Sequence, residues 1–299
     1  MKILVTGSEG NIGKILVPYL RNKGHEVFGI DIVQGVGSDY RVADINHPIE
    51  LAECFADFEP EIVYHMAAVV SRVTSEKSPS LTIQTNVAGT SNVIQLCKRY
   101  DSKLIFFSTS EVYGNGIDGW ALDEHETTPH PNNLYGVSKL MGEALVHYEV
   151  DKGLKAIIIR PFMFYHENET MGTHRSAIIR FVESLLKGEK ITVHHDSERG
   201  WLHLDEAVEI LEKIAYVKTF EIVNIGTPDI WKMEDVARLI CDELRVSEDL
   251  IQLEPLPDRM TLVKCPELNK QVLLTGCRGT KILLGKGIKR VIKAVKKRI

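Results

Sequence analysis

The sequence predicts an α/β protein with a doubly wound parallel sheet and a smaller, interleaved α/β lobe. Short apolar runs, typical of buried strands, alternate with amphipathic helical patterns from the first residues to Pro161. Such alternation is typical of parallel sheets with helices on both faces. A glycine pattern joins the first strand to the first helix, and polar residues gather where the predicted strands end. Together these three observations define the fold class.

Six strands are predicted in the first half, at residues 2–6, 26–31, a short third strand closing at Asp44-Ile45, 62–68, 104–107 and 156–161. Helical patterns cover residues 14–23, continue from Asn86 to Tyr100, and begin again at Tyr135. Residues 162–175 are polar and irregular, and are followed by a helix at 176–187, a strand at 190–193 and a strand near 221–226 that returns to the main sheet.

The composition is that of an ordinary globular protein of 299 residues, 44% hydrophobic and 26% charged. The net charge of −5 is uneven: eight Lys or Arg and no acid follow residue 280, which leaves 28 basic and 41 acidic residues before it, a balance of −13. A basic tail can bind nucleic acid or membrane. However, Ile288, Val291, Ile292 and Val295 recur at helical spacing, so we expect a packed terminal helix with a wet basic face and neither of those partners.

The five cysteines are scattered and include no CxxC pair, which indicates a reduced intracellular protein rather than a disulfide framework or a zinc site. Met1 and Lys2 lead directly into a strand, leaving no room for a signal peptide, and no apolar run reaches membrane length. The predicted location is cytoplasmic. Histidines at positions 166, 174, 194, 195 and 203 raise the question of a metal, but nothing in the sequence brings them together, and we predict none.

A glycine-rich turn follows the first strand. Gly7, Gly10 and Gly13 form a GxxGxxG pattern that also contains Asn11 and Ile12. The first glycine permits a tight turn, the second lets backbone approach a pyrophosphate, and the third lets helix pack on strand. The pyrophosphate then lies at the positive end of the helix. With its flanking strand and helix, the pattern predicts a Rossmann-type dinucleotide site rather than a plain turn.

Asp31 ends the second strand, 18 residues after Gly13. A carboxylate there accepts hydrogen bonds from the adenosine ribose and repels a 2′-phosphate. No Arg or Lys lies between Lys23 and Arg41 to bind that phosphate. The sequence therefore predicts NAD as the cofactor. Residues 1–161 are the expected NAD-binding domain, with the returning strand near 221–226, and residues 162–299 are mainly the substrate-binding lobe.

Other candidate cofactor-binding residues follow from the rule that ligands lie beyond the carboxyl ends of parallel strands. Asp44 suits contact with the adenine, and the small residues after the fourth strand permit close approach of a cofactor. Asn86 lies inside a helical pattern, and the alternative to cofactor binding is a structural role in which its amide bonds backbone. Besides the glycine turn, the full set is Asp31, Ile32, Asp44, Ile45, Ala67, Ala68, Asn86, Ser108, Tyr135, Lys139 and Arg160.

Tyr135 and Lys139 lie four residues apart on one helix face. A Lys ammonium beside a phenol lowers a phenolic pKa that is otherwise about 10. With the hydroxyl of Thr109 facing it from a strand end, this pair predicts a base that removes the proton of an alcohol. That is half of what alcohol oxidation by a nicotinamide requires. A Tyr and Lys at this spacing are often only a surface pair. The catalytic interpretation is favoured because the other candidate residues fall at the ends of predicted strands, where ligands of such sheets bind.

These motifs together resemble the extended short-chain dehydrogenase/reductases, and more narrowly the nucleotide-sugar epimerase/dehydratase group. The likeness spans nearly the whole chain and rests on Thr6-Gly7-xx-Gly10-xx-Gly13, Asp31, the Ser-Thr-Ser-Glu-Val-Tyr-Gly run at 108–114, Tyr135-xxx-Lys139, Arg160-Pro161, and Arg199-Gly-Trp-Leu-His-Leu-Asp205. The resemblance implies that Tyr135 is the base, that Lys139 binds the nicotinamide ribose and tunes Tyr135, and that Thr109 holds the 4-hydroxyl of the sugar. It also implies NAD, a nucleotide-diphosphate sugar whose diphosphate Arg199 binds, and a homodimer.

The shared chemistry begins when Tyr135 removes the 4-hydroxyl proton and C4 passes a hydride to NAD, which gives a 4-keto sugar. Hydride return after rotation inverts C4, proton removal at C5 with loss of water at C6 gives a 4-keto-6-deoxy sugar, and loss of carbon dioxide from a glucuronate gives a pentose. Thr109-Ser110-Glu111 resembles the 4,6-dehydratases and UDP-glucuronate decarboxylases. Glu111 is then the C5 base or part of the C6 site, with a salt bridge or a backbone contact as the alternative.

Two departures from the family pattern bear on the substrate. Lys264 stands where the decarboxylases have an arginine, and Lys lacks the planar two-point grip on a carboxylate. Met163 stands where many relatives have an Asn that helps hold the nucleotide diphosphate. The leading expectation is a redox-neutral NAD-dependent epimerase/dehydratase. The alternatives are a UDP-glucuronate decarboxylase-like enzyme, an NAD-dependent alcohol oxidoreductase on a non-nucleotide substrate, and a non-catalytic NAD-binding regulator.

Overall fold

The computed structural model describes residues 1–35, 37–115, 121–170, 176–257 and 261–299. The chain divides into two compact units, each with its own cluster of buried apolar side chains. Unit 1 consists of Met1–Val112, Pro131–Pro161 and Leu211–Val223, and unit 2 consists of Tyr113–His130, Phe162–Ile210 and Asn224–Ile299. Both units are therefore built from separated stretches of the sequence.

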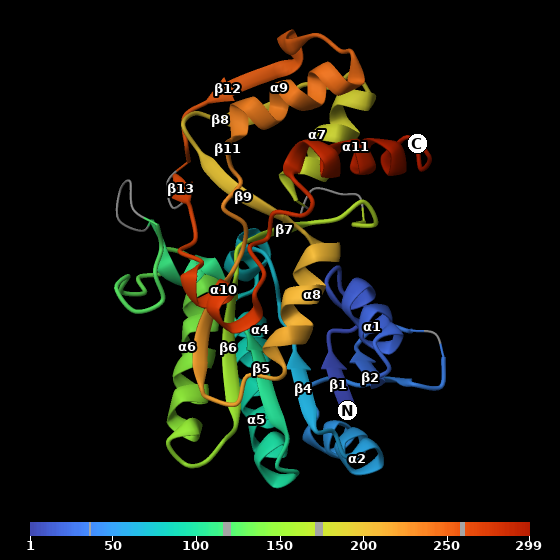
Figure 1. Ribbon diagram of the computed structural model, residues 1–299, viewed down its shortest axis with the longest axis vertical. Coiled ribbons are helices and arrows are strands. Elements are labelled where there is room, and N and C mark those ends of the chain that lie inside the picture. Colours follow the sequence, from blue (N-terminus) through green and yellow to red (C-terminus); the bar gives the residue numbers. More distant parts are fainter. Residues whose placement is uncertain (36, 116–120, 171–175, 258–260) are drawn as a thin grey trace. The chain divides into compact units, whose positions relative to one another are not determined.

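Unit 1 is built on the predicted parallel sheet (Figure 1). Over the described residues its strand order is β10-β6-β5-β4-β1-β2-β3, with parallel pairing from β6 to β3. The strands are β1 (Lys2–Thr6), β2 (Glu26–Asp31), β3 (Tyr40–Val42), β4 (Ile62–His65), β5 (Lys103–Phe107), β6 (Ala156–Pro161) and β10 (Glu221–Ile225). The order reverses between β1 and β4, which is where doubly wound sheets bind their ligands.

Helices of unit 1 cover the sheet, which explains why its strands are almost continuously apolar. They are α1 (Gly13–Asn22), α2 (Pro48–Phe58), α3 (Arg72–Lys77), α4 (Pro79–Ile83), α5 (Thr90–Arg99) and α6 (Leu134–Val150), with a 3₁₀ turn η2 (Ser110–Tyr113) after β5. Helix α1 packs on β1 and β2, α5 on β4 and β5, and α6 on β6, as the ribbon shows for α5 and α6 (Figure 1). Leu4, Val63 and Ile158 lie fully buried in the resulting core.

A π-helix, η1 (Gln84–Gly89), interrupts the helical pattern that the sequence extends to Tyr100. Segments of this kind occur frequently at functional sites. Asn86 lies within it and is fully buried. Its Oδ1 accepts a hydrogen bond from Val69 N at 2.7 Å, and its Nδ2 donates to Val69 O at 3.1 Å and to Ser138 Oγ at 2.9 Å. Asn86 therefore has the backbone-bonding role and ties the segment after β4 to α6.

Unit 2 contains two small sheets and a helical layer. In one sheet β9 (Glu198–His203) pairs with β11 (Ile230–Lys232), with β13 (Val263–Lys264) and with β7 (Met163–Tyr165). In the other, β8 (Ile191–His194) and β12 (Ile251–Glu254) run parallel. The helices are α7 (Ala177–Leu186), α9 (Met233–Leu244), α10 (Asn269–Thr275), α11 (Leu284–Val295), the turn η3 (Glu248–Leu250) and α8 (Leu204–Ile214), which continues into unit 1. Helices α7, α9 and α11 pack together over an apolar core.

The C-terminal segment folds as its periodicity predicts. Helix α11 buries Ile288, Val291 and Val295, while its lysines remain on the outer face. One expectation for this half is wrong: Met163–Tyr165, expected to be irregular, is a strand because it pairs with β9, a partner far away in sequence. Residues 171–175 of the same stretch lie outside the described residues. No helix in the described part of the chain combines the length and the apolarity needed to cross a bilayer.

Candidate active site

The glycine turn of unit 1 is closed so tightly that side chains do not fit. Gly7 has φ +73°, and a Cβ there would lie 2.8 Å from Ala67 N. At Gly13 a Cβ would lie 2.4 Å from the carbonyl oxygen of Ser8. Helix α1 begins at Gly13 with no acidic residue in its first turn, so its positive end faces no carboxylate of its own. The glycine turn and the start of α1 fit the pyrophosphate of a dinucleotide.

Asp31 closes β2 beside this turn, as predicted. Its Oδ2 accepts a hydrogen bond from Glu9 N at 2.9 Å, and its Oδ1 accepts one from Ile32 N at 2.8 Å. The two backbone donors fix the orientation of the carboxylate relative to the glycine turn. Asp31 is thereby held as an acceptor at the end of β2, where the ribose of a dinucleotide is expected.

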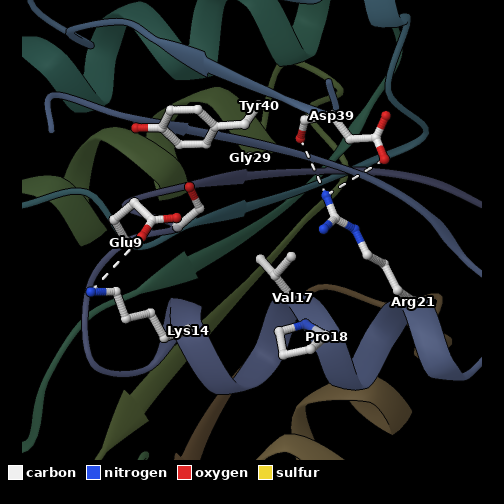
Figure 2. A pocket seen from close by; sticks show the side chains of 9 residues that line it. Glu9, Lys14, Val17, Pro18, Arg21, Gly29, Asp39 and Tyr40 are labelled. Atoms are coloured by element: carbon white, nitrogen blue, oxygen red, sulfur yellow. Dashed lines mark hydrogen bonds and ion pairs between the residues drawn. The ribbon is translucent and has the colours of Figure 1, made fainter. Parts of the chain in front are cut away.

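A hollow of about 180 Å³ is lined by Gly29, by Tyr40 and by Glu9, whose backbone N–H donates to Asp31 (Figure 2). Figure 2 shows that both of its cations face an acid: Lys14 lies 3.8 Å from Glu9, and Arg21 lies 3.9 Å from Asp39. A 2′-phosphate near Asp31 would therefore meet a carboxylate and two cations that already have acidic partners. The charge arrangement agrees with the preference for NAD over NADP.

Tyr135 lies in the first turn of α6 and is hydrogen-bonded to Thr109, as the sequence predicts. Although the residue keeps some exposed surface, burial of its phenol raises the pKa of Tyr135, and the charge of Glu111 raises it further. The hydrogen bond from Thr109 opposes this only partly. The expectation that the pKa of Tyr135 is lowered is therefore wrong for this structure.

Lys139 does not offset the effect of burial on the phenol. Its side chain is 1% exposed, and its Nζ lies 4.3 Å from the centroid of the Phe106 ring. Burial lowers the pKa of Lys139 to about 7, although the charge of Glu143 opposes the shift. An ammonium that is half neutral near pH 7 supplies little positive field to a neighbouring phenol. The sequence shows the helical spacing of the pair, but it does not show that both members are buried.

Ser108 and Arg160, both predicted to bind the cofactor, meet at Glu143 on α6. Arg160 donates from Nε to Glu143 Oε1 at 2.9 Å and from Nη2 to Oε2 at 2.7 Å, and Ser108 Oγ donates to Oε1. All three side chains are nearly fully buried. Glu143 is not among the residues predicted from the sequence, although its position four residues after Lys139 puts both on one helix face.

The remaining predicted residues of unit 1 differ in their burial and in their hydrogen bonds. Ala67 N donates to Thr6 Oγ1 at 3.1 Å next to the glycine turn, and Asp44 Oδ1 accepts from Asn46 N at 2.9 Å. In contrast, Ile45 is 3% exposed and packs in the core, whereas Ile32 is 68% exposed. Ala68, Asn11 and Ile12 are half-buried. Ser110 is 1% exposed, and its Oγ has no hydrogen-bond partner among the described residues.

In unit 2, Arg199 is 8% exposed and lies on β9. Its Nη1 donates to the carbonyl oxygens of Glu198 and Leu262 at 2.7 Å each, and its Nη2 donates to that of Thr261. Lys264 lies beside it in register and is 3% exposed. Arg199 thus has backbone partners in this structure, and its predicted contact with a substrate diphosphate stays a prediction.

The structure brings together two histidines of unit 2, His166 and His203, which nothing in the sequence predicts to be close. The rings of His166 and His203 have centroids 5.0 Å apart, and their side chains share a cluster with Glu167 and Asp205. Backbone N–H groups donate to Nδ1 of both rings, so each ring carries its proton on Nε2. His166 donates to Asp205 at 3.1 Å, and His203 donates to Glu167 at 2.8 Å.

Arg290 on α11 provides the positive charge of this cluster and lies 2.6 Å from Asp205 Oδ2. A metal bound by Nε2 of His166 and His203 requires each Nδ1 to carry a proton, which would face a backbone N–H donor. The hydrogen-bond roles therefore favour a charge network over a metal site. His174, considered with these histidines in the sequence, lies outside the described residues.

The chain matches the model of the NAD dependent epimerase/dehydratase family over residues 3–226. It belongs to that family. UDP-N-acetyl-alpha-D-glucosaminuronate decarboxylase of Bacillus cytotoxicus is 30% identical over 257 residues, 79% of this chain and 78% of that protein. UDP-glucuronic acid decarboxylase 6 of Arabidopsis thaliana is 28% identical over 270 residues, 86% of this chain and 78% of that protein. The structure of UDP-glucose 4-epimerase from Thermotoga maritima with UDP-glucose has TM-score 0.92 at 23% identity and covers 100% of this chain and 99% of its own.

Membership in the NAD dependent epimerase/dehydratase family confirms the family resemblance, the Rossmann-type fold and the assignment as an NAD-dependent enzyme. The individual site residues stay predictions, and the structure adds the geometry that bears on each of them. Within unit 1 it brings the glycine turn together with Asp31, and Thr109 together with Tyr135. It turns Arg160 and Ser108 to Glu143.

Proposed function

We propose that this enzyme oxidises C4 of a nucleotide sugar with NAD, lets the 4-keto sugar react at C5 or C6, and returns the hydride in the same turnover. The observation that carries the proposal is the arrangement of Thr109, Glu111 and Tyr135 in unit 1. The phenol of Tyr135 is hydrogen-bonded to the hydroxyl of Thr109, and the charge of the Glu111 carboxylate raises the pKa of that phenol. The names of the relatives, which are decarboxylases of UDP-linked uronic acids, support a nucleotide-sugar substrate.

Bound NAD supplies a hydride acceptor at C4 and later a hydride donor. Tyr135 takes the proton of the 4-hydroxyl, and Thr109 orients that hydroxyl by a hydrogen bond. Because burial and Glu111 raise the pKa of Tyr135, its phenol is protonated in the resting protein and suits the return step, in which it protonates the C4 oxygen. The forward step needs positive charge near the phenol, and the charged form of Lys139, which Glu143 favours, is the chain's own source.

Decarboxylation of a UDP-linked hexuronate is the outcome that we propose first. A ketone at C4 stands β to a C6 carboxylate, so the C5–C6 bond breaks with its electron pair passing toward the C4 oxygen, and carbon dioxide leaves. A proton delivered to C5 completes the step. Both decarboxylase relatives support this outcome. Lys264 keeps a cation where the decarboxylases have an arginine, as a point charge rather than a two-point grip.

Elimination of water between C5 and C6 is the second candidate, and Glu111 favours it. This carboxylate lies two residues beyond Thr109 and accepts a hydrogen bond from Asn133 Nδ2 at 2.9 Å. A donor of this kind stabilises the ionised form of a carboxylate. An ionised Glu111 is suited to removing the proton at C5 that the neighbouring ketone makes acidic.

A substrate panel distinguishes the outcomes. The purified protein is incubated with NAD and with UDP-hexuronates and UDP-, dTDP-, GDP- and CDP-hexoses, and products are identified by mass spectrometry and proton NMR. Loss of carbon dioxide identifies decarboxylation, loss of water identifies elimination, and unchanged mass with altered stereochemistry identifies epimerisation. Steady accumulation of NADH indicates net oxidation of an alcohol instead. The proposal is wrong if none of these sugars turns over.

We also propose that the enzyme is a cytoplasmic homodimer. Val137, Met141 and Tyr148 are exposed at helical spacing on α6, and a paired helix would cover this apolar face. The five cysteines, all within the described residues, form no disulfide, which suits a reducing compartment. Light scattering of the protein and of Met141→Lys tests the dimer. A monomer of about 34 kDa for the unaltered protein would contradict it, since the chain mass is 33.7 kDa.

A further inference from the structure

Asn133 begins helix α6, two residues before Tyr135. Its backbone is extended, with φ −144° and ψ 157°, and its Oδ1 caps the helix by accepting a hydrogen bond from Gly136 N at 2.9 Å. Its Nδ2 donates to Glu111 Oε2 at 2.9 Å and to Asn132 Oδ1 at 3.0 Å. The side chain is 6% exposed. One amide therefore connects the start of the helix that carries Tyr135 with the carboxylate of Glu111.

The orientation of the Asn133 amide follows from the helix cap. Gly136 N–H is a donor, so only the oxygen end of the amide satisfies it, and the nitrogen end must face Glu111. Turning the amide over would lose the cap and bring its oxygen against a carboxylate. The backbone contact is equally close, because a Cβ at Gly136 would lie 2.6 Å from the carbonyl oxygen of Glu111. The start of α6 thus constrains Glu111 at both its backbone and its side chain.

This contact acts on the reactive groups in two ways. The N–H donor favours the ionised carboxylate of Glu111 and restricts the rotation of its side chain. The charge of Glu111 in turn raises the pKa of Tyr135, so the carboxylate and the phenol are close enough to influence each other. Asn133 stands on the same helix turn as Tyr135 and therefore fixes the carboxylate relative to the phenol.

We propose that Asn133 is a positioning residue that holds Glu111 for proton transfer at C5 of the 4-keto sugar, an inference that rests on the proposed function. In decarboxylation the C5–C6 bond breaks, carbon dioxide leaves, and protonated Glu111 gives its proton to C5 and recovers one from solvent. In elimination the C5–H bond breaks and the proton passes to Glu111. The electron pair then expels the C6 hydroxyl, which leaves as water with that proton.

Asn133→Ser is the informative variant, because Ser is also a good helix cap but lacks the amide donor. We expect kcat to fall about 10- to 100-fold, as for other misplaced catalytic groups, with KM changed less than about 3-fold. Loss of the donor raises the pKa of Glu111, so the limb of the kcat profile that Glu111 sets moves to higher pH. This is the acid limb where Glu111 acts as a base in elimination, and the basic limb where it acts as an acid in decarboxylation. Asn133→Asp keeps the cap and sets a second carboxylate against Glu111, and should move that limb further.

A double-mutant cycle separates positioning from helix capping. If Asn133 acts through Glu111, Asn133→Ser causes no further loss of kcat in the Glu111→Gln background. Equal losses in both backgrounds, or an unchanged kcat in Asn133→Ser, would overturn the inference. Ser176→Ala, which removes the cap of α7 in unit 2, is the control for a lost cap and should leave the pH profile in place.

A measurement without substrate keeps this inference separate from the proposed function. Carbon-13 NMR of labelled glutamate carboxyl groups gives the pKa of Glu111, whose signal is identified by its absence in Glu111→Gln. A higher pKa in Asn133→Ser than in the unaltered protein supports the positioning contact, and an equal pKa refutes it. If the unaltered protein turns over no nucleotide sugar while this pKa difference is present, the proposed reaction fails and the contact between Asn133 and Glu111 stands.

Discussion

Each unit contains a cluster of charged side chains, and the two clusters respond to burial in opposite ways. In unit 2, Glu167 and Asp205 each accept a hydrogen bond from a neutral imidazole and each contact Arg290. Burial alone would raise the pKa of both carboxyls, yet hydrogen bonds and neighbouring charges hold each pKa below its ordinary value. Complete pairing thus keeps these carboxylates ionised over the whole neutral range.

In unit 1, neighbouring charges offset the effect of burial on the pKa of Lys139 only in part. Lys139 is buried beside the ring of Phe106, and Glu143 divides its charge between Lys139 and Arg160. The pKa of Lys139 accordingly falls to about 7, where a modest change in its surroundings decides whether it is charged. Groups with shifted pKa values that are buried near one another are typical of catalytic sites. The two units thus differ in that burial is offset for the carboxylates of unit 2, whereas in unit 1 it leaves the pKa of Lys139 well below its ordinary value.

Removing the phenol should have the largest effect. Tyr135→Phe is expected to lower kcat by about 10²- to 10⁴-fold, the range for loss of a general acid–base group, because Tyr135 is the proposed acceptor of the C4 proton. NAD affinity, measured by fluorescence titration, should change by less than about 3-fold since the ring remains. Activity close to that of the unaltered enzyme would remove Tyr135 from the mechanism.

Unpairing the buried ion pair of unit 1 should have the largest effect on stability. Glu143→Gln takes the carboxylate away from Arg160, whose side chain is 2% exposed, and should lower the free energy of unfolding by about 3–5 kcal/mol. Urea denaturation followed by circular dichroism measures it. The matched variant Glu167→Gln disturbs the more exposed cluster of unit 2 and should cost less. A larger loss for Glu167→Gln would reverse the comparison.

The lowered pKa of Lys139 predicts the direction in which stability changes with pH. Because the folded-state pKa of Lys139 is about 7, below its ordinary value, the unfolded chain binds one proton more than the folded protein between pH 7 and roughly 10. Stability should therefore rise with pH across that window. In Lys139→Met this rise should diminish, and the melting temperature at pH 7 should increase by a few degrees. Parallel pH profiles of melting temperature for the two proteins would contradict the lowered pKa.

The smallest effect is expected at Arg290, whose side chain is 35% exposed. Arg290→Met should cost about 1 kcal/mol near pH 7, because solvent shares the charges of its partners. Since the carboxyls it contacts have lowered pKa values, their contribution is present above their ordinary range and is lost as pH falls through the folded values. The difference between variant and unaltered protein should therefore shrink in acid. A difference that grows in acid would contradict this assignment.

Local patterns in the sequence were enough for most of the main sheet. Strands Glu26–Asp31 and Ala156–Pro161 lie at the expected bounds, because each is an apolar run bounded by turn residues. The strand Met163–Tyr165 was beyond reach, since three residues show no period and its partner is β9. The π-helix was also beyond reach, because packing rather than composition decides where a helix admits an extra residue.

The sequence predicts a set of candidate site residues, but it does not predict their pKa values. The spacing of Tyr135 and Lys139 placed them on one helix face, whereas the burial that shifts their pKa values is a tertiary property. Two contacts had usable signals in the sequence. Asn133 stands two residues before the predicted start of the helix at Tyr135, and Asn is a preferred cap. Glu143 follows Lys139 at helical spacing.

The π-helix at Gln84–Gly89 has a consequence for how the chain can change. A π-helical turn takes up one residue more than an α-helical turn, so removing one residue from this segment would let it close into a regular α-helix and change the directions of its side chains. Asn86 would then lose its contacts with Val69 and Ser138, although neither partner had been altered. A one-codon deletion here would thus act on the helix carrying Tyr135 and Lys139 without replacing any residue that touches a ligand. Chain length, as well as side-chain chemistry, encodes the alignment of that helix.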